Sequence, residues 1–370
     1  DIEMNLGTPS NDSLNSRKFE HLQRASEAQV TADSRPIWYK SLTIDYEPLL
    51  APHPDIEKEI AKSSNSFKFL GKSFHFPFWI SSMTGGVGPA RHINQNLARV
   101  AAEFGLGMGL GSCRALLQDD QYFDDFNLRS IIGDDRLFLA NIGIAQIEQL
   151  LAEKKIERIH VLVDRLRADG LIIHVNPLQE FFQPEGDRIT RAPIHVLEEF
   201  LENAPYPVVV KEVGQGMGPR SLRALMKLRL AAIDFASFGG TNFTKVELNR
   251  GTYGPLSPYH GFAHVGHTAY EMVEMVKQIE LEMGPASSGQ VGQKQYIISG
   301  GIQSVLEGMP CLAALQGRSV LGMATSFLNH ATGRYEELHE YVQTQVGAYL
   351  LARQYLHYGG LASPESGRQQ

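Results

Sequence analysis

The segment HVNPLQE at residues 174–180 brings an imidazole, two amides and a carboxylate close together in the chain. In an extended strand His174 and Asn176 share one face, and the following proline ends the strand because it cannot donate to the ladder. Gln179 and Glu180 then lie on the loop beyond it. The Glu180 carboxylate could bind Mg²⁺ together with phosphate oxygens of a substrate. Taken alone, His174 is more typical of a hydrogen-bonded core histidine.

Lys211 ends the apolar run VVVK, where a buried ammonium is costly unless it is paired. It could pair with Glu212 or extend to solvent, but a lysine at such a position more often faces an anion or an electron-rich ring. Two glycine-rich segments, SGG at 299–301 and LGMA at 321–324, follow later apolar runs. Glycines there let main-chain N–H groups approach phosphate oxygens, so they predict a phosphate site rather than ordinary turns.

Two further groups of residues could do chemistry, but the residues alone favour a plainer interpretation. On a helix Arg17 and His21 lie one turn apart with Lys18 alongside, and such a basic cluster is usually a solvated surface. Cys113 stands beside Arg114, which would lower the pKa of its thiol. Without a second thiol or a placed base, we expect Cys113 to be a small packed residue.

Eight short apolar runs alternate with helical patterns and must position these motifs. Runs that are apolar on both faces are typical of parallel strands, and eight strand–helix repeats predict an α/β fold, a (β/α)₈ TIM barrel. A doubly wound sheet is the alternative. The active site of a barrel lies at the carboxyl ends of its strands. The runs span residues 78–83, 106–112, 137–143, 171–177, 208–214, 233–240, 296–301 and 319–324.

The rest of the chain is predicted to flank this barrel, which covers residues 77–358. Residues 1–16 form a disordered tail, and residues 17–76 form an extension with a helix at 17–31 and a lid or hairpin contributing to the active-site mouth. Residues 359–370 are a flexible tail. A loop after the sixth strand, residues 241–266, is too long for an ordinary connection and is expected to be functional.

Composition excludes several classes of protein. The 34 Lys and Arg residues against 41 Asp and Glu residues give a net charge of −7, which argues against a nucleic-acid partner. The two cysteines, without a CxxC pair, exclude a disulfide scaffold and a structural zinc site and fit a reducing compartment. No apolar run is long enough to span a membrane, and the polar first residues lack a signal peptide. These features predict a cytoplasmic protein.

Taken in order, the motifs resemble those of the type 2 isopentenyl diphosphate isomerases, which are FMN-dependent (β/α)₈ barrels. The resemblance runs from Arg17 to about Leu328, and HVNPLQE between GSCR and VKEVG is its most specific part. The motifs are RKFEH at 17–21, MTGG at 83–86, GSCR at 111–114, HVNPLQE at 174–180, VKEVG at 210–214, GGTN at 239–242, SGG at 299–301 and LGMA at 321–324.

The resemblance implies a role for each matching residue. It assigns the flavin ring and ribityl chain to Met83, Thr84, Ser112, Asn141, Lys211 and Thr241. It assigns the flavin phosphate to Gly300, Gly301, Met323 and Ala324. It assigns the substrate diphosphate to Arg17, Lys18, His21, Arg114, His174 and Asn176. Gln179 is placed near the reacting carbons, with Lys211 and Glu247 as further catalytic residues, and Glu180 is placed as the Mg²⁺ ligand.

The activity so implied is the interconversion of isopentenyl and dimethylallyl diphosphate in isoprenoid biosynthesis. Reduced FMN would handle the protons, NADPH would reduce the flavin, and the protein would be a homo-oligomer, a tetramer or an octamer. One alternative is an FMN oxidoreductase that passes hydride to a small phosphorylated or anionic substrate, since the fold alone does not fix the reaction. The other is a flavin- or phosphate-binding regulator without catalysis. The chain departs from the family at Cys113 and Phe243, where glutamine and tryptophan are usual.

Overall fold

The computed structural model describes residues 19–20, 24–25, 27–36, 39, 44–62, 67–81, 85, 88–284 and 294–359. The chain forms two compact units, residues 1–42 and 43–370. In the first, the 3₁₀ helix η1 (Ala32–Ser34) starts at Thr31, whose carbonyl accepts from the Ser34 hydroxyl at 2.7 Å. The predicted tail 1–16 lies outside the described residues. Of the predicted helix at 17–31, residues 19, 20 and 24 are helical.

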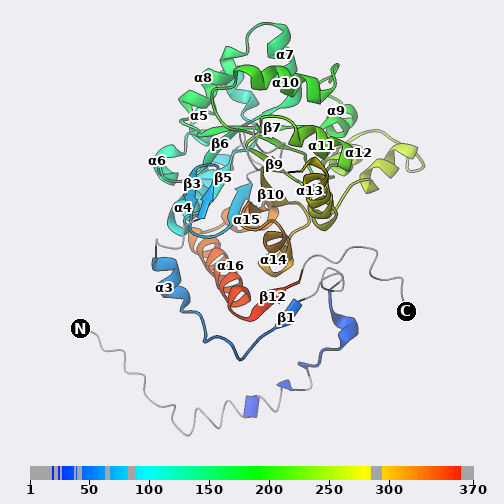
Figure 1. Ribbon diagram of the computed structural model, residues 1–370. Coiled ribbons are helices and arrows are strands. Elements are labelled where there is room, and N and C mark those ends of the chain that lie inside the picture. The colour runs from blue at the N-terminus through cyan, green and yellow to red at the C-terminus, as the bar shows by residue number, and fades with distance from the viewer. Residues whose placement is uncertain are drawn as a thin grey trace. The chain divides into compact units, whose positions relative to one another are not determined.

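The second unit is built around a closed barrel of eight parallel strands, as the sequence predicted (Figure 1). Each strand pairs with its neighbours in the chain, and the last pairs with the first. The strands are shorter than the apolar runs, because the runs continue into the loops at the carboxyl ends. They are β4 (Phe78–Ser81), β5 (Gly107–Gly109), β6 (Phe138–Gly143), β7 (Gly170–His174), β8 (Val208–Lys211), β9 (Ala232–Asp234), β10 (Gln295–Ser299) and β11 (Ser319–Met323).

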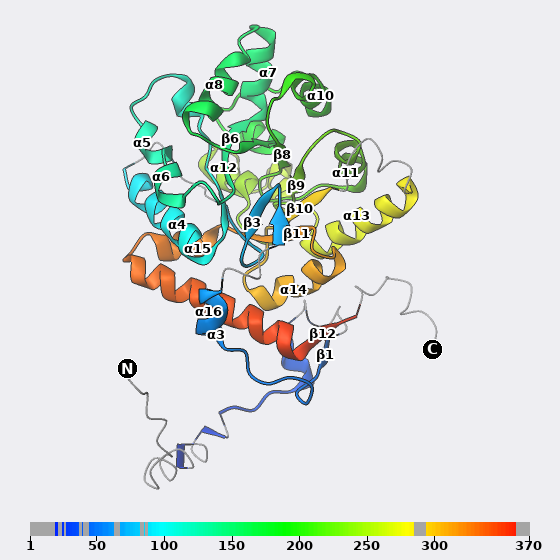
Figure 2. The same ribbon diagram turned by 60° about the vertical axis from the view of Figure 1, so that its left-hand side comes forward.

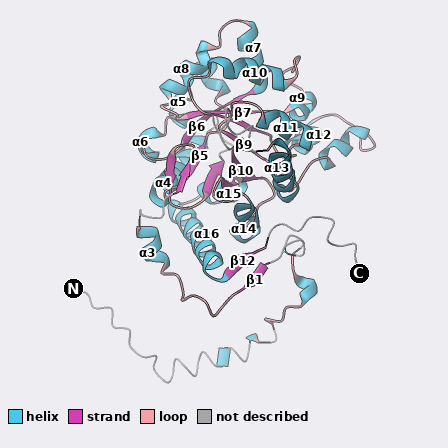
Figure 3. Cartoon of the chain, viewed as in Figure 1, coloured by secondary structure: helices cyan, strands magenta, loops and turns pink. Residues whose placement is uncertain are grey.

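Helices surround the strands and cover their outer faces (Figure 3). In the first of them Ile93, Leu97, Val100 and Phe104 are buried on one side, and the helix ends at Gly105, which has φ +67°. The elements outside the strands are α4 (Ala90–Phe104), η2 (Arg114–Leu117), α5 (Phe123–Phe126), α6 (Arg129–Ile132), α7 (Ile144–Ala152), α8 (Glu157–Arg165), α9 (Pro177–Phe182), α10 (Pro193–Asn203), α11 (Pro219–Met226), α12 (Phe243–Arg250), η3 (Pro258–His264), α13 (Ala269–Met283), α14 (Val305–Ala314), α15 (Thr325–Ala331) and α16 (Tyr335–Tyr355).

The chain before the barrel adds a small sheet, a helix and a hairpin. Strand β1 (Ile44–Tyr46) pairs antiparallel with β12 (Leu356–Tyr358), and Figure 2 shows this pair at the end of α16. Helix α3 (Ile56–Ala61), which the sequence pattern did not indicate, starts at Asp55, whose carboxylate accepts from the main chain of Lys58 at 3.0 Å. Within the described residues, no helix is long and apolar enough to cross a membrane.

The hairpin of β2 (Phe67–Phe69) and β3 (Lys72–Phe74) closes the end of the barrel that is opposite to the active-site side. Phe69 and Phe74 are fully buried and pack on interior side chains near the amino ends of the strands, among them Trp79. A hairpin was expected at one end of the barrel, within an extension assigned to the active-site mouth. These residues lie at the other end, because their aromatic side chains fill the apolar bottom of the barrel.

Residues 241–266 are more ordered than the sequence suggested. Instead of a structureless loop after the sixth strand, this stretch contains α12 and the 3₁₀ helix η3. The Asn242 carboxamide oxygen caps α12 by accepting from the main chain of Lys245 at 2.9 Å. Phe182 of α9, Leu248 of α12 and Ala263 of η3 form a separate hydrophobic cluster, so these helices make a small subdomain on the barrel rim.

Candidate functional site

The side chains that fill the barrel interior form an apolar layer near the amino ends of the strands and a mostly polar layer nearer the carboxyl ends. The apolar layer near the amino ends consists of Trp79, Leu139, Ile172, Val209, Ala232, Ile297 and Val320. Residues two positions further along a strand point to the same side. That rule gives a polar layer of Ser81, Asn141, His174, Lys211, Asp234, Ser299 and Gly322. The apolar layer excludes water from below, and the polar layer faces the carboxyl ends of the strands.

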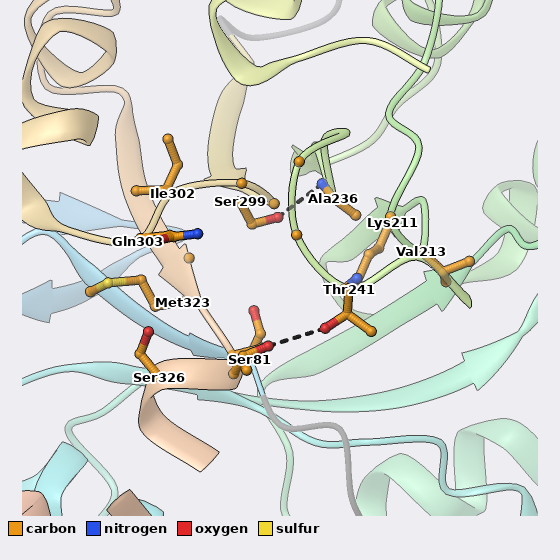
Figure 4. A pocket seen from close by; sticks show the side chains of 18 of the residues that line it. Ser81, Lys211, Val213, Ala236, Thr241, Ser299, Ile302, Gln303, Met323 and Ser326 are labelled. Carbon is orange, nitrogen blue, oxygen red and sulfur yellow. Dashed lines mark hydrogen bonds between the residues drawn. The ribbon is translucent and has the colours of Figure 1, made fainter. Parts of the chain in front are cut away.

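A cavity of about 570 Å³ opens above one side of the polar layer, at the ends of β8, β9, β10, β11 and β4 (Figure 4). This size lies in the range of cofactor and ligand pockets. The lining residues are Ser81, Lys211, Val213, Gly214, Ala236, Gly239, Gly240, Thr241, Phe243, Ser299, Gly300, Gly301, Ile302, Gln303, Gly322, Met323, Ala324, Thr325 and Ser326.

The glycines in this wall are required by close main-chain approach. Gly300 has φ +83°, and a Cβ atom there would lie 2.2 Å from the main-chain nitrogen of Ser237. A Cβ atom on Gly240 would come within 3.0 Å of the Gly301 nitrogen. The loops after β9 and β10 therefore touch each other through bare main chain. Gly300, Gly301, Met323 and Ala324, predicted to hold a phosphate, all line the cavity.

Lys211 lines the same cavity, and among the described residues its ammonium forms no salt bridge. Its ammonium donates to the main-chain carbonyl of Glu212 at 2.8 Å. The Glu212 carboxylate instead accepts from the main-chain N–H groups of Gly214 and Gln215, at 2.8 and 2.6 Å. Lys211 therefore contacts Glu212 through the main-chain carbonyl and not through a hydrogen bond to the carboxylate, while its side chain lines the cavity.

The remaining predicted flavin residues are placed differently. Thr241 lines the cavity, and its hydroxyl lies 3.1 Å from that of Thr325. Asn141 belongs to the polar layer beside His174, and Ser112 is exposed at the end of β5, where its hydroxyl accepts from the main chain of Arg114. Met83 and Thr84 lie outside the described residues, as do Arg17, Lys18 and His21.

His174 is held by a hydrogen bond that fixes its tautomer. The Asn141 amide nitrogen donates to the Leu110 carbonyl at 3.0 Å, so its oxygen faces His174 Nδ1 at 2.7 Å and accepts from it. The imidazole therefore carries its proton on Nδ1 and presents an unprotonated Nε2. Burial and the nearby Lys211 ammonium lower the pKa of His174 to about 4. Near neutral pH the ring is uncharged in the ligand-free protein.

Helix α9 brings the other polar residues of HVNPLQE together. The buried Asn176 amide nitrogen donates to Gln179 Oε1 and to Glu180 Oε1, both at 3.0 Å. Glu180 Oε2 accepts from the main-chain N–H of Asp187 at 2.7 Å. Pro177 occupies the first turn, where its missing N–H costs nothing. One short helix thus fixes an amide and a carboxylate at the end of β7.

Glu247 is buried on α12, with 4% of its surface exposed, and its carboxylate accepts from Arg250 at 2.6 Å. Arg250 also contacts Glu185 at 2.6 Å, so the three residues form a chain of ion pairs between α12 and the segment after α9. Glu247 is not among the residues that line the cavity. Its predicted catalytic role stays a prediction.

The chain is similar to known proteins along most of its length. No model of a known protein family matches the chain. Over 340 residues the chain is 32% identical to the isopentenyl-diphosphate delta-isomerase of Synechocystis sp., covering 90% of each chain. This chain belongs to the isopentenyl-diphosphate delta-isomerase family. It is also 36% identical over 279 residues to the enzyme of that name from Rickettsia akari, covering 75% of this chain and 76% of the relative.

A solved structure shares the barrel fold of this member of the isomerase family. A mutant flavocytochrome b2 with pyruvate bound superposes with a TM-score of 0.52 at 11% identity, over 92% of this chain and 87% of that one. At this identity the likeness concerns the barrel only. The family and the isomerase class inferred from the motifs are confirmed by the sequence relatives.

At Cys113 and Phe243, the two positions where a departure from the family was expected, the structure gives different results. Cys113 is fully buried in the core outside the barrel, and desolvation raises the pKa of its thiol to about 12, so it is a packed and unreactive residue. This confirms the plainer interpretation of Cys113. Phe243 lines the cavity and provides an aromatic wall.

Sequence reasoning missed several residues of the candidate site. Asp234 is fully buried in the polar layer and accepts from the Ser299 hydroxyl. Desolvation raises the pKa of Asp234, and the Lys211 ammonium opposes that effect. An acidic residue within an apolar run, as in AIDF at 232–235, was the available signal. Asp187, which pairs with Arg114, and Gln146, which donates to Asp187, gave no local signal.

Proposed function

We propose that this protein interconverts isopentenyl diphosphate and dimethylallyl diphosphate, with reduced FMN bound in the cavity at the carboxyl ends of the strands. The observation that carries the proposal is the pairing of His174 with Lys211 on adjacent strands. Lys211 belongs to the cavity, and His174 begins the polar segment HVNPLQE. A cofactor site and a group of anion- and metal-binding side chains are therefore neighbours, as the family would require.

The cavity suits a flavin nucleotide. The main chain of Gly300 and Gly301 is bare enough for phosphate oxygens to approach. Lys211 supplies a cation beside the ring, where it would stabilise negative charge on the reduced flavin. Phe243 and Ile302 offer apolar surface to the ring. Met83 and Thr84 remain predicted flavin contacts.

The substrate would lie over β5 and β7, with its diphosphate held by Arg114, His174 and Asn176 and by the predicted cluster Arg17, Lys18 and His21. Among the described residues, no group of three or more His, Cys, Asp or Glu side chains could hold a metal ion. A Mg²⁺ ion at Glu180 would therefore take most of its ligands from phosphate and water, as this ion commonly does.

The chain's own residues bind and orient, and they keep water away. When bound, reduced FMN supplies the proton-exchanging group for moving the double bond. Gln179 orients that exchange from α9, and its side chain is itself held by Asn176. Diphosphate binding provides positioning energy for a reaction whose alkene is a poor base. NADPH as flavin reductant, Mg²⁺ as metal, a homo-oligomeric assembly and a cytoplasmic location are parts of the same proposal.

The test is anaerobic turnover in D₂O with a limiting, known amount of reductant. An isomerase leaves substrate and product at one oxidation level, so a single reduction of the flavin should support many turnovers, and deuterium should enter the product. An oxidoreductase would consume one reductant per product and yield a product two hydrogens richer. Product capped at the reductant supplied, measured by mass analysis, would contradict the isomerase and favour the oxidoreductase.

A further inference from the structure

Asp187, in the segment between α9 and α10, lies at the centre of a hydrogen-bond network that the proposed reaction does not yet use. Its carboxylate accepts from Arg114 Nη1 at 2.5 Å and from Arg114 Nη2 at 3.4 Å. The Gln146 amide donates to the same carboxylate at 2.7 Å. A two-pronged bond of this kind fixes the plane of a guanidinium. Arg114 is thus held in one orientation although its side chain is 48% exposed.

Asp187 is itself anchored to α9. Its main-chain N–H donates to Glu180 Oε2 at 2.7 Å, so the chain folds back onto the helix it has just left. Gly186 makes this possible, because a Cβ atom there would lie 1.9 Å from the Glu180 carbonyl oxygen. The position of Asp187 is therefore set by Glu180, and the orientation of Arg114 is set by Asp187.

We propose that Asp187 is a positioning residue that holds the Arg114 guanidinium ready for the substrate diphosphate. The inference rests on the proposed function, which assigns the diphosphate to Arg114. Arginine carries five N–H donors, and the bonds to Asp187 occupy one on each terminal nitrogen. The remaining donors, on the exposed part of the guanidinium, are free to bind phosphate oxygens.

The physical advantage is preorganisation. A long, half-exposed arginine samples many rotamers, and ordering it when an anion binds reduces affinity. Asp187 orders the side chain before the anion arrives. A carboxylate on a guanidinium also occupies donors that a phosphate could use, and this competition acts against affinity. The two effects predict opposite signs for removal of the Asp187 charge.

The test measures the binding of inorganic pyrophosphate, with Mg²⁺ present, to the full-length FMN-loaded protein by calorimetry. Asp187→Asn keeps the main-chain bond to Glu180 and the size of the side chain but removes the charge that orients Arg114. We expect the dissociation constant of pyrophosphate from the Asp187→Asn variant to be roughly five- to twentyfold higher than from the unmodified protein. For the isopentenyl substrate, KM should rise more than kcat falls, because the loss concerns binding of the diphosphate and not the reacting carbons.

Two further variants make the result specific. Arg114→Ala should weaken pyrophosphate binding, and adding Asp187→Asn to it should have no further effect, since the residue acts through Arg114. Asp134→Asn is the matched control, because Asp134 pairs with Arg167 at 2.8 Å on a distant exposed surface. It should bind pyrophosphate like the unmodified protein.

Each other result overturns the inference in a recognisable way. If Arg114→Ala weakens binding but Asp187→Asn leaves it unchanged or tightens it, Asp187 does not position Arg114 and the proposed function stands. If Asp187→Asn weakens binding equally in the Arg114→Ala background, its effect does not pass through Arg114. If neither the unmodified protein nor any variant binds pyrophosphate, the assignment of the diphosphate to Arg114 fails and the inference fails with it.

Discussion

Lys211 on β8 and Asp234 on β9 are paired across adjacent strands, and both belong to the polar layer of the barrel interior. Asp234 has no exposed surface, and its Oδ2 atom has no hydrogen-bond partner among the described residues. The Lys211 ammonium is the cation that acts on this carboxylate. Asp234 does not line the cavity, but it lies beside Lys211 on the adjacent strand, so we expect the two side chains to act in opposite directions on the reduction potential of a bound flavin.

Asp234→Asn is expected to raise the reduction potential of bound FMN. Removing a negative charge leaves Lys211 unopposed and stabilises the anionic reduced ring. A unit charge within roughly 10 Å contributes on the order of 1–2 kcal/mol, which is about 20–40 mV for a two-electron couple. Lys211→Ala should shift the potential in the negative direction and weaken flavin binding. Potentiometric titration of both variants checks this. Equal reduction potentials in both variants would contradict the placement of Lys211 beside the flavin ring.

Gly300→Ala is expected to weaken FMN binding and lower stability. The left-handed φ of Gly300 disfavours any side chain, and the added Cβ would clash with the main chain at Ser237. Such strain costs about 1–3 kcal/mol. Gly254→Ala is the control, since nothing lies within 4 Å of its Cβ position. Flavin fluorescence and thermal unfolding measure both effects, and unchanged flavin affinity in Gly300→Ala would exclude this loop from the flavin site.

Gln179→Ala is expected to keep flavin and lose most turnover, with kcat falling roughly 10²-fold or more because a group acting in proton exchange contributes about this much. The neighbouring substitution Glu180→Gln should chiefly raise the Mg²⁺ concentration needed for half-maximal activity, by roughly tenfold, or about 1.4 kcal/mol. Steady-state kinetics with a Mg²⁺ titration separates the two. Near-normal turnover in Gln179→Ala would remove its proposed role.

Acid is expected to destabilise the protein through His174. Its pKa is about 4 in the folded protein and 6.5 in its ordinary state, so the unfolded chain binds the proton more readily. The neutral ring contributes up to about 3 kcal/mol to the free energy of unfolding. This contribution is complete above pH 6.5 and is lost as the pH falls from 6.5 toward 4. Glu212 and Asp234, whose pKa values are raised, act in the opposite direction.

The comparison with His174→Gln isolates this effect from those carboxylates. Urea unfolding at pH 7 and pH 5 should show a larger loss of stability in the unmodified protein than in the variant. An equal loss in both would contradict the neutral buried imidazole. Pyrophosphate binding provides a second measurement, because Nε2 must gain a proton before it can donate to phosphate. Calorimetry in two buffers of different ionisation enthalpy should show proton uptake near pH 7.

The barrel and the motifs at its mouth could be predicted from the amino-acid sequence. A run such as VVVK predicts a strand, because a strand that is buried on both faces appears in the sequence as consecutive apolar residues. The residues of the glycine-containing segments SGG and LGMA at the ends of β10 and β11 are neighbours in the chain, as are the residues of HVNPLQE, so each group was visible without a structure. Chain order alone placed them at one edge, because parallel strands all end on the same side.

The contacts among those residues could not be predicted, because they depend on how the whole chain folds. Arg114 and Asp187 are 73 residues apart, and nothing in either local segment indicates that they meet. Asp234 became part of the site through register with Lys211, and the hairpin at Phe67–Phe74 was fixed at the far end of the barrel by its two buried phenylalanines. Periodicity reports which face of an element is buried, whereas the partner across that face depends on the packing of the whole chain.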